Sequence, residues 1–413
     1  MGKSLKNAII GQSGGPTCVI NSSLFGVICE VISNRDKIGC LYGMRNGIEG
    51  FLREDFVNLF SFCGLDTLPP EMAIKNVEPL TNTPGAFLGS CRYRLAESAK
   101  NSEDYEKIVK ILEKYNIGYF FYIGGNDSMD TVAKLYEYTR VHMPELKVIG
   151  IPKTIDNDLA MTDHTPGYGS CAKYIATTVS EIARDRESYH TPSLTLIEIM
   201  GRETGWLTAS SVLGGADLIY LPERAFSPEQ FIADVNRVLE RKETVIVALS
   251  EGLRYENGVY LSEATESDVF GNRQLLGASR TLLKLAQDKT KCKARAVELS
   301  LSQRCASHLA SSTDINESIE VGKMAVKYAL DGENGKMVAL ERKQDKPYKV
   351  KIRTVSACDV ANQIKYLPSN YINSEGNFVT EEFLKYVKPL VKGEHYPKYE
   401  DGVPVHCVLN RGK

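Results

Sequence analysis

Short apolar runs alternate with amphipathic segments along the chain, and this pattern predicts an open, parallel α/β structure. Three runs, Asn7–Ile10, Tyr119–Ile123 and Leu194–Met200, are each followed at once by glycine and then by a helix-like pattern. Further predicted elements are strands at Lys147–Ile151, Asp217–Leu221, Thr244–Leu249 and Lys336–Leu340 and helices at Pro228–Arg241 and Arg273–Ala286. Because ligands of such sheets bind at the carboxyl ends of strands, a functional site is expected at the glycine turns.

The length of 413 residues predicts a division into two lobes. Hydrophobic cores stop growing at roughly 250–300 residues, so a chain of this length is expected to form two, with the functional site between them. Composition marks no boundary, since no low-complexity linker or block of like charge separates the halves. The polar stretch 369–413 is predicted to be a loop-rich C-terminal extension.

Charge and composition exclude several classes of partner. A formal net charge of −2, with 43% apolar and 25% charged residues, gives no general attraction for nucleic acid or an anionic membrane. No window approaches the roughly 20 apolar residues of a membrane span, and no signal peptide is recognised, so we expect a cytoplasmic protein. The ten cysteines include no CxxC or CxxH pair, which favours buried reduced thiols over a metal site.

The segment GQSGGP, residues 11–16, follows a predicted strand and precedes a helix-like stretch. Its backbone N–H groups, together with the helix N-terminus, could hold a phosphate. The alternative is a tight turn without a ligand. The segment is neither GxGxxG nor GxxxxGK followed by Ser or Thr, which argues against a dinucleotide-binding dehydrogenase and against a P-loop enzyme.

The segment GGNDSMDT, residues 124–131, repeats this arrangement with an amide at Asn126 and carboxylates at Asp127 and Asp130. Acidic groups at a phosphate-holding turn are useful where Mg²⁺ bridges them to phosphate oxygens. The alternative is that Asp127 or Ser128 simply caps the following helix. The segment alone favours neither interpretation.

The segment PKTIDND, residues 152–158, is the most informative, because it places a lysine and two acids in one turn directly after a predicted strand. A buried pair of like charges, Asp156 and Asp158, is costly unless a cation, a substrate hydroxyl or a hydrogen-bond network uses it. One such carboxylate suits general-base chemistry on an alcohol, and Lys153 could neutralise charge on a transferred phosphoryl group. A solvated turn held by its own aspartates is the alternative.

Taken together, six motifs resemble those of the phosphofructokinase family, in family order, from residue 7 to about residue 340. They are GQSGGP, TPGAFLGSCR at 83–92, GGNDS, PKTIDND, MGRETGW at 200–206 and ARAVELSLSQR at 294–304. The resemblance implies two Rossmann-like, three-layer α/β/α lobes with parallel-rich sheets that face a cleft. It implies a donor-binding lobe at 1–168 with a return segment near 303–355, and a sugar-phosphate lobe at 169–302 with part of 356–413 as an extension.

The resemblance also implies roles for the matching positions. Asp156 matches the general base that takes the proton of the sugar's C1 hydroxyl. Gly14 and Gly15 match the phosphate-holding loop, and Arg92 matches an arginine that reaches the transferred phosphoryl group. Asn126 falls where the family usually has a Mg²⁺-binding aspartate. The positions that match substrate contacts are Thr154, Ile155, Asp156, Met200, Gly201, Arg202, Glu251, Arg295, Leu301 and Arg304.

Two positions in this resemblance decide the phosphoryl donor. ATP-using members resemble GGDGS and PGTIDND, with glycine where this chain has Asp127 and Lys153. An aspartate would repel and obstruct a nucleotide's α-phosphate, whereas a lysine adds a cation beside a short donor. Pyrophosphate is therefore the expected donor, bound by Lys153, Arg92 and the glycine loop.

Other positions depart from the family pattern. Ser193 stands where ATP-dependent members carry a sugar-phosphate arginine, and Leu301 stands where they carry histidine or tyrosine. Part of that site must therefore be rebuilt from other residues. Phe25 and Cys29 stand in place of effector-binding arginines, which argues against regulation by ADP at that site.

The resulting hypothesis is a Mg²⁺-dependent, reversible phosphoryl transfer between pyrophosphate and fructose 6-phosphate, in glycolysis and gluconeogenesis, by a homodimer or homotetramer. One alternative is an ATP-dependent 6-phosphofructokinase. Another is a catalytically silent regulatory subunit of the same fold. The silent alternative predicts damage to TIDND, and that segment is intact.

Overall fold

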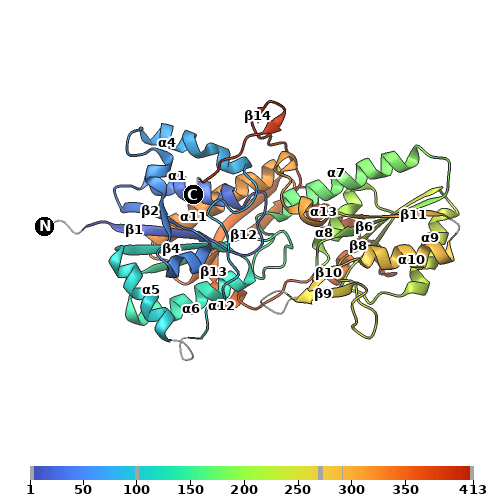
Figure 1. Ribbon diagram of the computed structural model, residues 1–413, viewed down its shortest axis with the longest axis horizontal. Coiled ribbons are helices and arrows are strands. Elements are labelled where there is room, and N and C mark those ends of the chain that lie inside the picture. The colour runs from blue at the N-terminus through green and yellow to red at the C-terminus, as the bar shows by residue number, and fades with distance from the viewer. Residues whose placement is uncertain (1–3, 98–101, 268–272, 291, 410–413) are drawn as a thin grey trace.

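Two sheets of mainly parallel strands form the centre of the computed structural model, which describes residues 4–97, 102–267, 273–290 and 292–409 (Figure 1). Within these residues the first sheet has seven strands in the order β13-β12-β5-β4-β1-β2-β3, and the second has four in the order β11-β6-β8-β7. The first sheet contains β1 (Lys6–Gln12), β2 (Ile38–Met44), β3 (Phe56–Asn58), β4 (Ile117–Gly124), β5 (Lys147–Pro152), β12 (Lys336–Asp345) and β13 (Tyr348–Ser356). The second contains β6 (Ser193–Ile199), β7 (Leu218–Tyr220), β8 (Thr244–Ser250) and β11 (Lys293–Glu298).

Helices cover both sheets. The longer ones are α1 (Ile20–Ser33), α5 (Ser102–Lys114), α6 (Asn126–His142) and α11 (Ser312–Leu330) at the first sheet, and α7 (Tyr168–Glu187), α9 (Pro228–Leu239) and α10 (Ala278–Lys289) at the second (Figure 1). The short ones are α2 (Gly47–Leu52), α3 (Leu59–Cys63), α4 (Pro70–Val77), α8 (Trp206–Ala209), α12 (Ala357–Val360) and α13 (Glu381–Val387). Two small antiparallel sheets of two strands each pair β9 (Glu263–Ser267) with β10 (Arg273–Leu276) and β14 (Tyr399–Glu400) with β15 (Val403–Pro404).

The central strands are buried on both faces, as their apolar runs predict. In β1, Ala8 and Ile10 pack in one core cluster together with Leu24 of α1, whereas Ile9 packs in another cluster together with Phe120 of β4. Alternate side chains of one strand thus enter two different cores. Parallel sheets need this, because their crossover helices cover both faces.

All seven predicted strands form, and the predicted α/β fold class is confirmed. The predicted helix Arg273–Ala286 is wrong at its start. Its first four residues form β10, which pairs antiparallel with β9, and the helix α10 begins only at Ala278. Gly277 between them has φ +94°, a left-handed conformation that ends the strand and that glycine adopts without steric cost.

The chain first forms strands of the first sheet, then those of the second, and then two more strands of the first. Strands β1 to β5 belong to the first sheet, β6, β7, β8 and β11 to the second, and β12 and β13 return to the first. On this basis we propose a lobe of residues 1–168 with 303–355 and a second lobe of 169–302 with part of 356–413.

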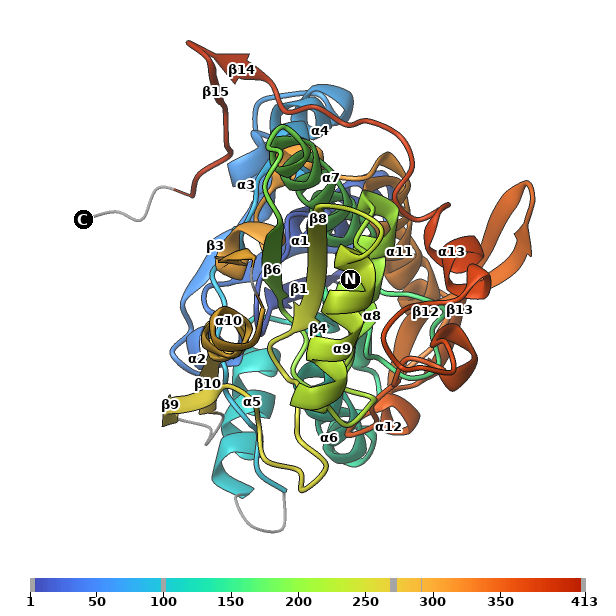
Figure 2. The ribbon, with the colours of Figure 1, turned by 90° about the vertical axis from the view of Figure 1, so that its right-hand side faces the viewer.

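The C-terminal segment after β13 contacts both lobes (Figures 1 and 2). Its helix α12 packs against α6 of the first lobe, while Phe383 and Tyr386 of α13 lie in a core cluster of the second. The chain then returns to the first lobe, where the Cys407 N–H donates to Thr83 Oγ1 at 2.8 Å. The predicted loop-rich extension is therefore packed along both lobes.

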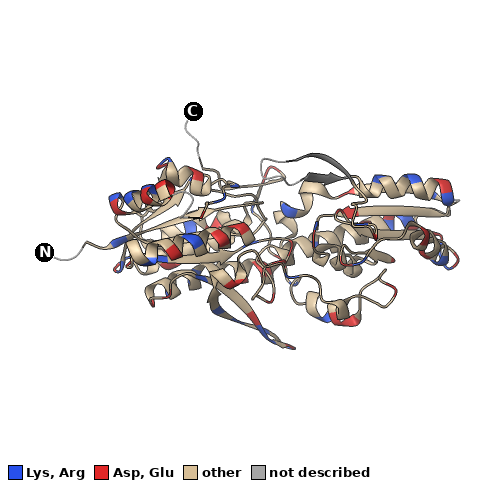
Figure 3. Ribbon diagram, turned by 90° about the horizontal axis from the view of Figure 1, so that it is seen from below, with Lys and Arg blue, Asp and Glu red and all other residues tan. Residues whose placement is uncertain are grey.

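Basic and acidic residues are interspersed along the helices of both lobes, and neither sign has a lobe of its own (Figure 3). This agrees with the near-neutral net charge of −2. Among the helices that the structure describes, none combines the length and the apolar character that crossing a bilayer requires.

A buried charged network joins the loop before α7 to α11, β12 and β13. The His164 ring nitrogens contact Asp163 Oδ2 at 2.8 Å and Glu317 Oε2 at 2.7 Å, and Arg342 Nη2 pairs with Asp163 at 3.0 Å. Tyr348 donates its hydroxyl hydrogen to the other oxygen of Glu317 at 2.7 Å. Burial alone would lower the pKa of His164, but the two carboxylates outweigh it and raise that pKa to about 9.

This network predicts a pH-dependent stability. Because the folded pKa of His164 lies above the ordinary value of 6.5, its stabilisation is complete below pH 6.5 and is lost as the pH rises through about 9. We expect the free energy of unfolding to fall over that range by about 2–3 kcal/mol, since one pKa unit corresponds to about 1.4 kcal/mol. Urea unfolding at pH 6.5 and at about pH 9 measures this change in the free energy of unfolding. His164→Gln should remove most of this dependence, and the exposed His308→Gln should retain it; an unchanged slope in His164→Gln contradicts the assignment.

Candidate active site

A cleft of about 830 Å³ is lined by turns from both sheets. The first sheet contributes the turns after β1, β4 and β5, and the second contributes the ends of β6, β8 and β11 and the 3₁₀ helix η3 (Ser300–Arg304). The residues predicted from sequence that line it are Gly14, Gly15, Arg92, Asn126, Asp127, Lys153, Thr154, Asp156, Met200, Arg202, Glu251, Leu301 and Arg304. The fold thus brings together motifs separated by almost 300 positions.

The glycine turn after β1 lies against the turn that contains residues 152–158 at the end of β5, which we call the catalytic turn for its predicted role. Gly14 has φ +77°, and a Cβ there would stand 3.2 Å from Lys153 Nζ. Lys153 Nζ donates to the Gly15 carbonyl at 2.6 Å. The Gly14 N–H donates to the Cys91 carbonyl at 3.1 Å, so this N–H is used inside the protein. Gly14 is therefore needed for its conformation and for the room it leaves beside the lysine.

Cations gather around this glycine turn. Lys153 is only 3% exposed, and burial lowers its pKa to about 8, against the opposing effect of Asp156 and Asp158. Arg304 and Arg92 are close enough to lower the same pKa further, and Arg304 Nη1 would be 3.3 Å from a Cβ at Gly15. A buried lysine beside two arginines needs anionic partners, which makes this end of the cleft suited to phosphoryl groups.

The catalytic turn carries two partly buried carboxyl groups. Burial and the neighbouring Asp158 raise the pKa of Asp156 to about 7, although Lys153 opposes the shift. Burial also raises the pKa of Asp158. Thr154 orients the turn, because its hydroxyl accepts from the Asp156 N–H at 3.1 Å and contacts Asp156 Oδ2 at 3.4 Å. A carboxyl group that titrates close to neutral pH is suited to accept and return a proton.

Helix α6 begins directly after β4, and its first two residues, Asn126 and Asp127, line the cleft. Asn126 is held by the C-terminal segment, because its Oδ1 accepts from the Asn362 N–H at 2.5 Å and its Nδ2 donates to the Gln363 carbonyl at 2.6 Å. An amide oxygen has a second lone pair, so Asn126 as a metal ligand stays a prediction. Asp127 pairs with Arg94 Nη2 at 2.9 Å.

The second lobe contributes the opposite wall. Burial raises the pKa of Glu251 to about 7, and its Oε1 faces the Gly201 N–H at 3.4 Å. Arg202 Nε donates to the Tyr260 hydroxyl at 3.3 Å. The Met200 N–H donates to Gln303 Oε1 at 3.3 Å, which ties the MGRETGW turn to η3. Leu301 lines the cleft and is 56% exposed. It therefore presents an apolar side chain at the position where the family resemblance would place a histidine or tyrosine.

Three residues predicted as substrate contacts are not among the lining residues. The side chain of Ile155 packs in the core of the second lobe, and Gly201 is buried with φ +139°. Their roles as substrate contacts stay predictions. Arg295 is exposed on β11, at the edge of the second sheet, so a role for it would need a partner beyond the single chain.

The cleft also contains charged residues that the sequence analysis did not single out, among them Arg94, Glu198 and Glu298. Glu198 accepts from the Ser279 N–H at 2.8 Å and from its hydroxyl at 2.7 Å, and so supports the start of α10. Glu198 is an acid inside the mainly apolar run SLTLIEI, and this pattern could have indicated a buried carboxylate with hydrogen-bond partners. Arg94 lay two residues after the recognised Arg92.

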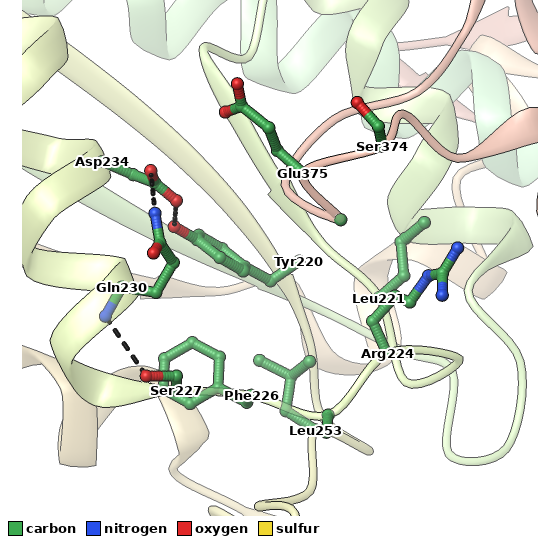
Figure 4. Close-up of a pocket in the computed structure, with 12 residues that line it drawn as sticks. Tyr220, Leu221, Arg224, Phe226, Ser227, Gln230, Asp234, Leu253, Ser374 and Glu375 are labelled. Atoms are coloured by element: carbon green, nitrogen blue, oxygen red, sulfur yellow. Dashed lines mark hydrogen bonds between the residues drawn. The ribbon is translucent and has the colours of Figure 1, made fainter.

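A smaller cavity of about 240 Å³ lies elsewhere in the second lobe, beside the start of α9 (Figure 4). Its buried acid is Asp234, which accepts from Tyr220 at 3.0 Å and from Gln230 at 2.8 Å. Ser227 at its rim accepts from the Gln230 N–H at 3.2 Å and caps the helix. The polar groups of this cavity are hydrogen-bonded to one another. The larger cleft is therefore the candidate active site.

A parallel α/β fold with a cationic glycine turn and a carboxyl-bearing turn in one cleft is typical of enzymes that transfer phosphoryl groups. The family model for phosphofructokinase matches residues 7–329. This chain belongs to the phosphofructokinase family, as its six motifs predicted.

Individual relatives extend the match over nearly the whole chain. Pyrophosphate–fructose 6-phosphate 1-phosphotransferase of Halomonas elongata is 37% identical, over 96% of this chain and 94% of the relative. The protein of the same name from Xanthomonas campestris is 38% identical, over 98% and 96%. The crystal structure of a pyrophosphate-dependent phosphofructokinase from Nitrosospira multiformis superposes with a TM-score of 0.87 at 33% identity, over 99% of this chain and 98% of that one.

Proposed function

We propose that this protein is a pyrophosphate-dependent phosphofructokinase, which reversibly transfers a phosphoryl group from pyrophosphate to the C1 hydroxyl of fructose 6-phosphate. The observation that carries the proposal is the buried Lys153, which lies between the glycine turn and Asp156 in one cleft. By the family resemblance, lysine at this position is, together with Asp127, one of the two residues that favour pyrophosphate over ATP. Relatives that match nearly the full chain carry the name of this activity.

The geometry suggests the following chemistry. Asp156 accepts the proton of the C1 hydroxyl, and the C1 oxygen attacks the terminal phosphorus of pyrophosphate. The bridging P–O bond then breaks, and inorganic phosphate leaves. Lys153, Arg92 and Arg304 neutralise the negative charge of the donor and the leaving phosphate. In the reverse direction Asp156 returns its proton to the C1 oxygen, which suits its pKa of about 7.

The donor set fits a Mg²⁺ ion that arrives with pyrophosphate. Mg²⁺ usually takes one or two protein oxygens together with substrate phosphates and waters. Across the described parts of the chain, no group of three acidic, histidine or cysteine residues forms a ready cage. We propose that its protein ligands are the carboxylate of Asp158 and Oδ1 of Asn126, which has a lone pair beyond the one that accepts from Asn362. Both residues line the cleft. When bound, Mg²⁺ would neutralise charge on the phosphate oxygens.

A side-by-side assay tests the donor. We expect turnover with pyrophosphate and Mg²⁺, little or none with ATP, and loss of activity when the metal is chelated. Fructose 1,6-bisphosphate formation is the measurement for each donor at equal enzyme concentration. A higher kcat/KM with ATP than with pyrophosphate contradicts the proposal.

We also propose a homo-oligomer whose sugar-phosphate site takes an arginine from a neighbouring subunit. Arg295 is the candidate, because it matches a family position with that role and is exposed outside the cleft of its own chain. Arg295→Ala and Asp156→Asn proteins should each be inactive, and mixing them should restore activity in hybrid oligomers. If mass-labelled subunits exchange and no activity returns, the site is not shared.

A further inference from the structure

One segment of the C-terminal part, residues 362–367, joins the motif turns of the cleft to one another. We call it the strap. At its first end it meets the turn after β4: the Asn362 N–H donates to Asn126 Oδ1, and Asn362 Nδ2 donates to Asp130 Oδ1 at 3.1 Å. The GGNDS turn is therefore fixed by residues more than 230 positions away.

The middle of the strap binds the catalytic turn. The Lys365 N–H donates to the Asp158 carbonyl at 2.8 Å, and Ile364 forms an antiparallel bridge with Leu159. This backbone contact lies directly beside the two carboxyl groups of the turn. A displacement of the strap would therefore move Asp158.

The far end of the strap binds the MGRETGW turn of the second lobe. Trp206 Nε1 donates to the Lys365 carbonyl at 2.9 Å. The Leu367 N–H donates to Glu223 Oε1 at 3.1 Å, and the same oxygen accepts from the Gly205 N–H at 2.8 Å. One short segment thus contacts three turns that carry site residues, in both lobes.

The side chain of Lys365 adds a second connection to the catalytic turn. Its ammonium group donates to Asn157 Oδ1 at 3.2 Å, to the Thr162 carbonyl at 3.2 Å and to the Asp163 carbonyl at 2.9 Å. It also lies 5.1 Å from the centre of the Trp206 ring. Asn157, between the two aspartates, has φ +55°, a left-handed conformation that is uncommon outside glycine and that asparagine adopts more readily than most residues.

We propose that Lys365 is a positioning residue for the phosphoryl transfer: by holding Asn157 it sets the direction of Asp156 and Asp158 in the cleft. Within the described residues Lys365 is not part of the cleft lining, so it acts through the turn and not on the substrate. This inference rests on the proposed function. Misplacement of a reacting group by about 1 Å can cost about 10²-fold in rate, so the effect should appear in kcat.

Lys365→Met tests the proposal, because it removes the ammonium group and keeps the backbone contacts. Asn157 Oδ1 retains the Thr165 N–H at 3.1 Å, and the Asp163 carbonyl retains the Tyr386 hydroxyl at 2.8 Å, so the fold should survive. We expect kcat to fall by at least about tenfold, with both KM values within about threefold of wild type. Lys388→Met, an exposed lysine of the same C-terminal part, is the matched control and should have wild-type kinetics.

A second readout is independent of turnover. Trp206 is the chain's one tryptophan and touches Lys365, so its fluorescence reports on the strap. We expect the emission of Lys365→Met to shift while that of Lys388→Met does not. If Lys365→Met does not fold, Lys365→Gln, which keeps an N–H donor, is measured in its place. We expect its kcat to be lower than that of the wild type, with a smaller loss than the roughly tenfold or greater loss expected for Lys365→Met.

The outcomes separate the two proposals. A wild-type protein without pyrophosphate-dependent activity refutes the proposed function. An active wild type with Lys365→Met kinetics equal to those of Lys388→Met overturns the positioning role, and so does a lower melting temperature with unchanged kcat, or a raised KM with unchanged kcat. A lower kcat with unchanged KM values and a shifted Trp206 emission supports it.

Discussion

Replacing Asp156 with asparagine should lower kcat by about 10²–10⁴-fold and leave both KM values nearly unchanged. The physical reason is that the amide keeps the size of the side chain and has no basic oxygen to take the C1 proton. The turn should keep its shape, because Thr154 and Thr204 contact the Asp156 backbone, at 3.1 Å to its N–H and 3.3 Å to its carbonyl. Steady-state kinetics in both directions are the measurement.

The exposed Asp359→Asn on α12 is the control for this experiment, since it removes one carboxylate outside the cleft lining. It should have wild-type kinetics. A kcat for Asp156→Asn close to that of the control means that Asp156 only shapes the turn and that another group accepts the proton.

Replacing Asp127 with glycine should raise kcat/KM for ATP by roughly 5- to 150-fold and lower it for pyrophosphate. Removing one close charge repulsion is worth about 1–3 kcal/mol, which corresponds to that range. The change also releases Arg94, which pairs with Asp127 at 2.9 Å, as a cation for the nucleotide's phosphates. The pair is about two-thirds exposed, with 62% of Arg94 and 66% of Asp127 accessible, so its loss should cost the fold little.

Two further variants separate the causes of this donor selection. Asp127→Asn removes the charge and keeps the bulk, so it should gain less with ATP than the glycine variant if obstruction matters. Adding Lys153→Gly should shift the donor ratio further, and the two changes should couple because both positions border the donor end of the cleft. An Asp127→Gly enzyme with wild-type pyrophosphate kinetics and no rise with ATP shows that Asp127 has no part in choosing the donor.

Local sequence determined the central strands and the turns that follow them. β4 and β5 are almost entirely apolar, and so is the centre of β1 from Ala8 to Gly11, because both faces of a parallel sheet are covered by helices. Such runs are visible without the fold. The turns after these strands were also recognisable from short stretches of sequence. Glycine at position 14 permits φ +77°, and the lysine and acids of PKTIDND lie within seven residues of one another.

Tertiary structure alone decided which partners those turns meet. Nothing local to Asn126 shows that its amide binds Asn362 and Gln363, because the contact spans more than 230 positions and uses backbone groups, which carry no sequence signal. The same holds for Lys365, an ordinary lysine in sequence whose ammonium is enclosed behind the catalytic turn. The exposure of Arg295 was equally hidden, since it depends on β11 lying at the edge of the sheet. Local pattern fixes which residues form a turn, whereas long-range packing fixes what each turn touches.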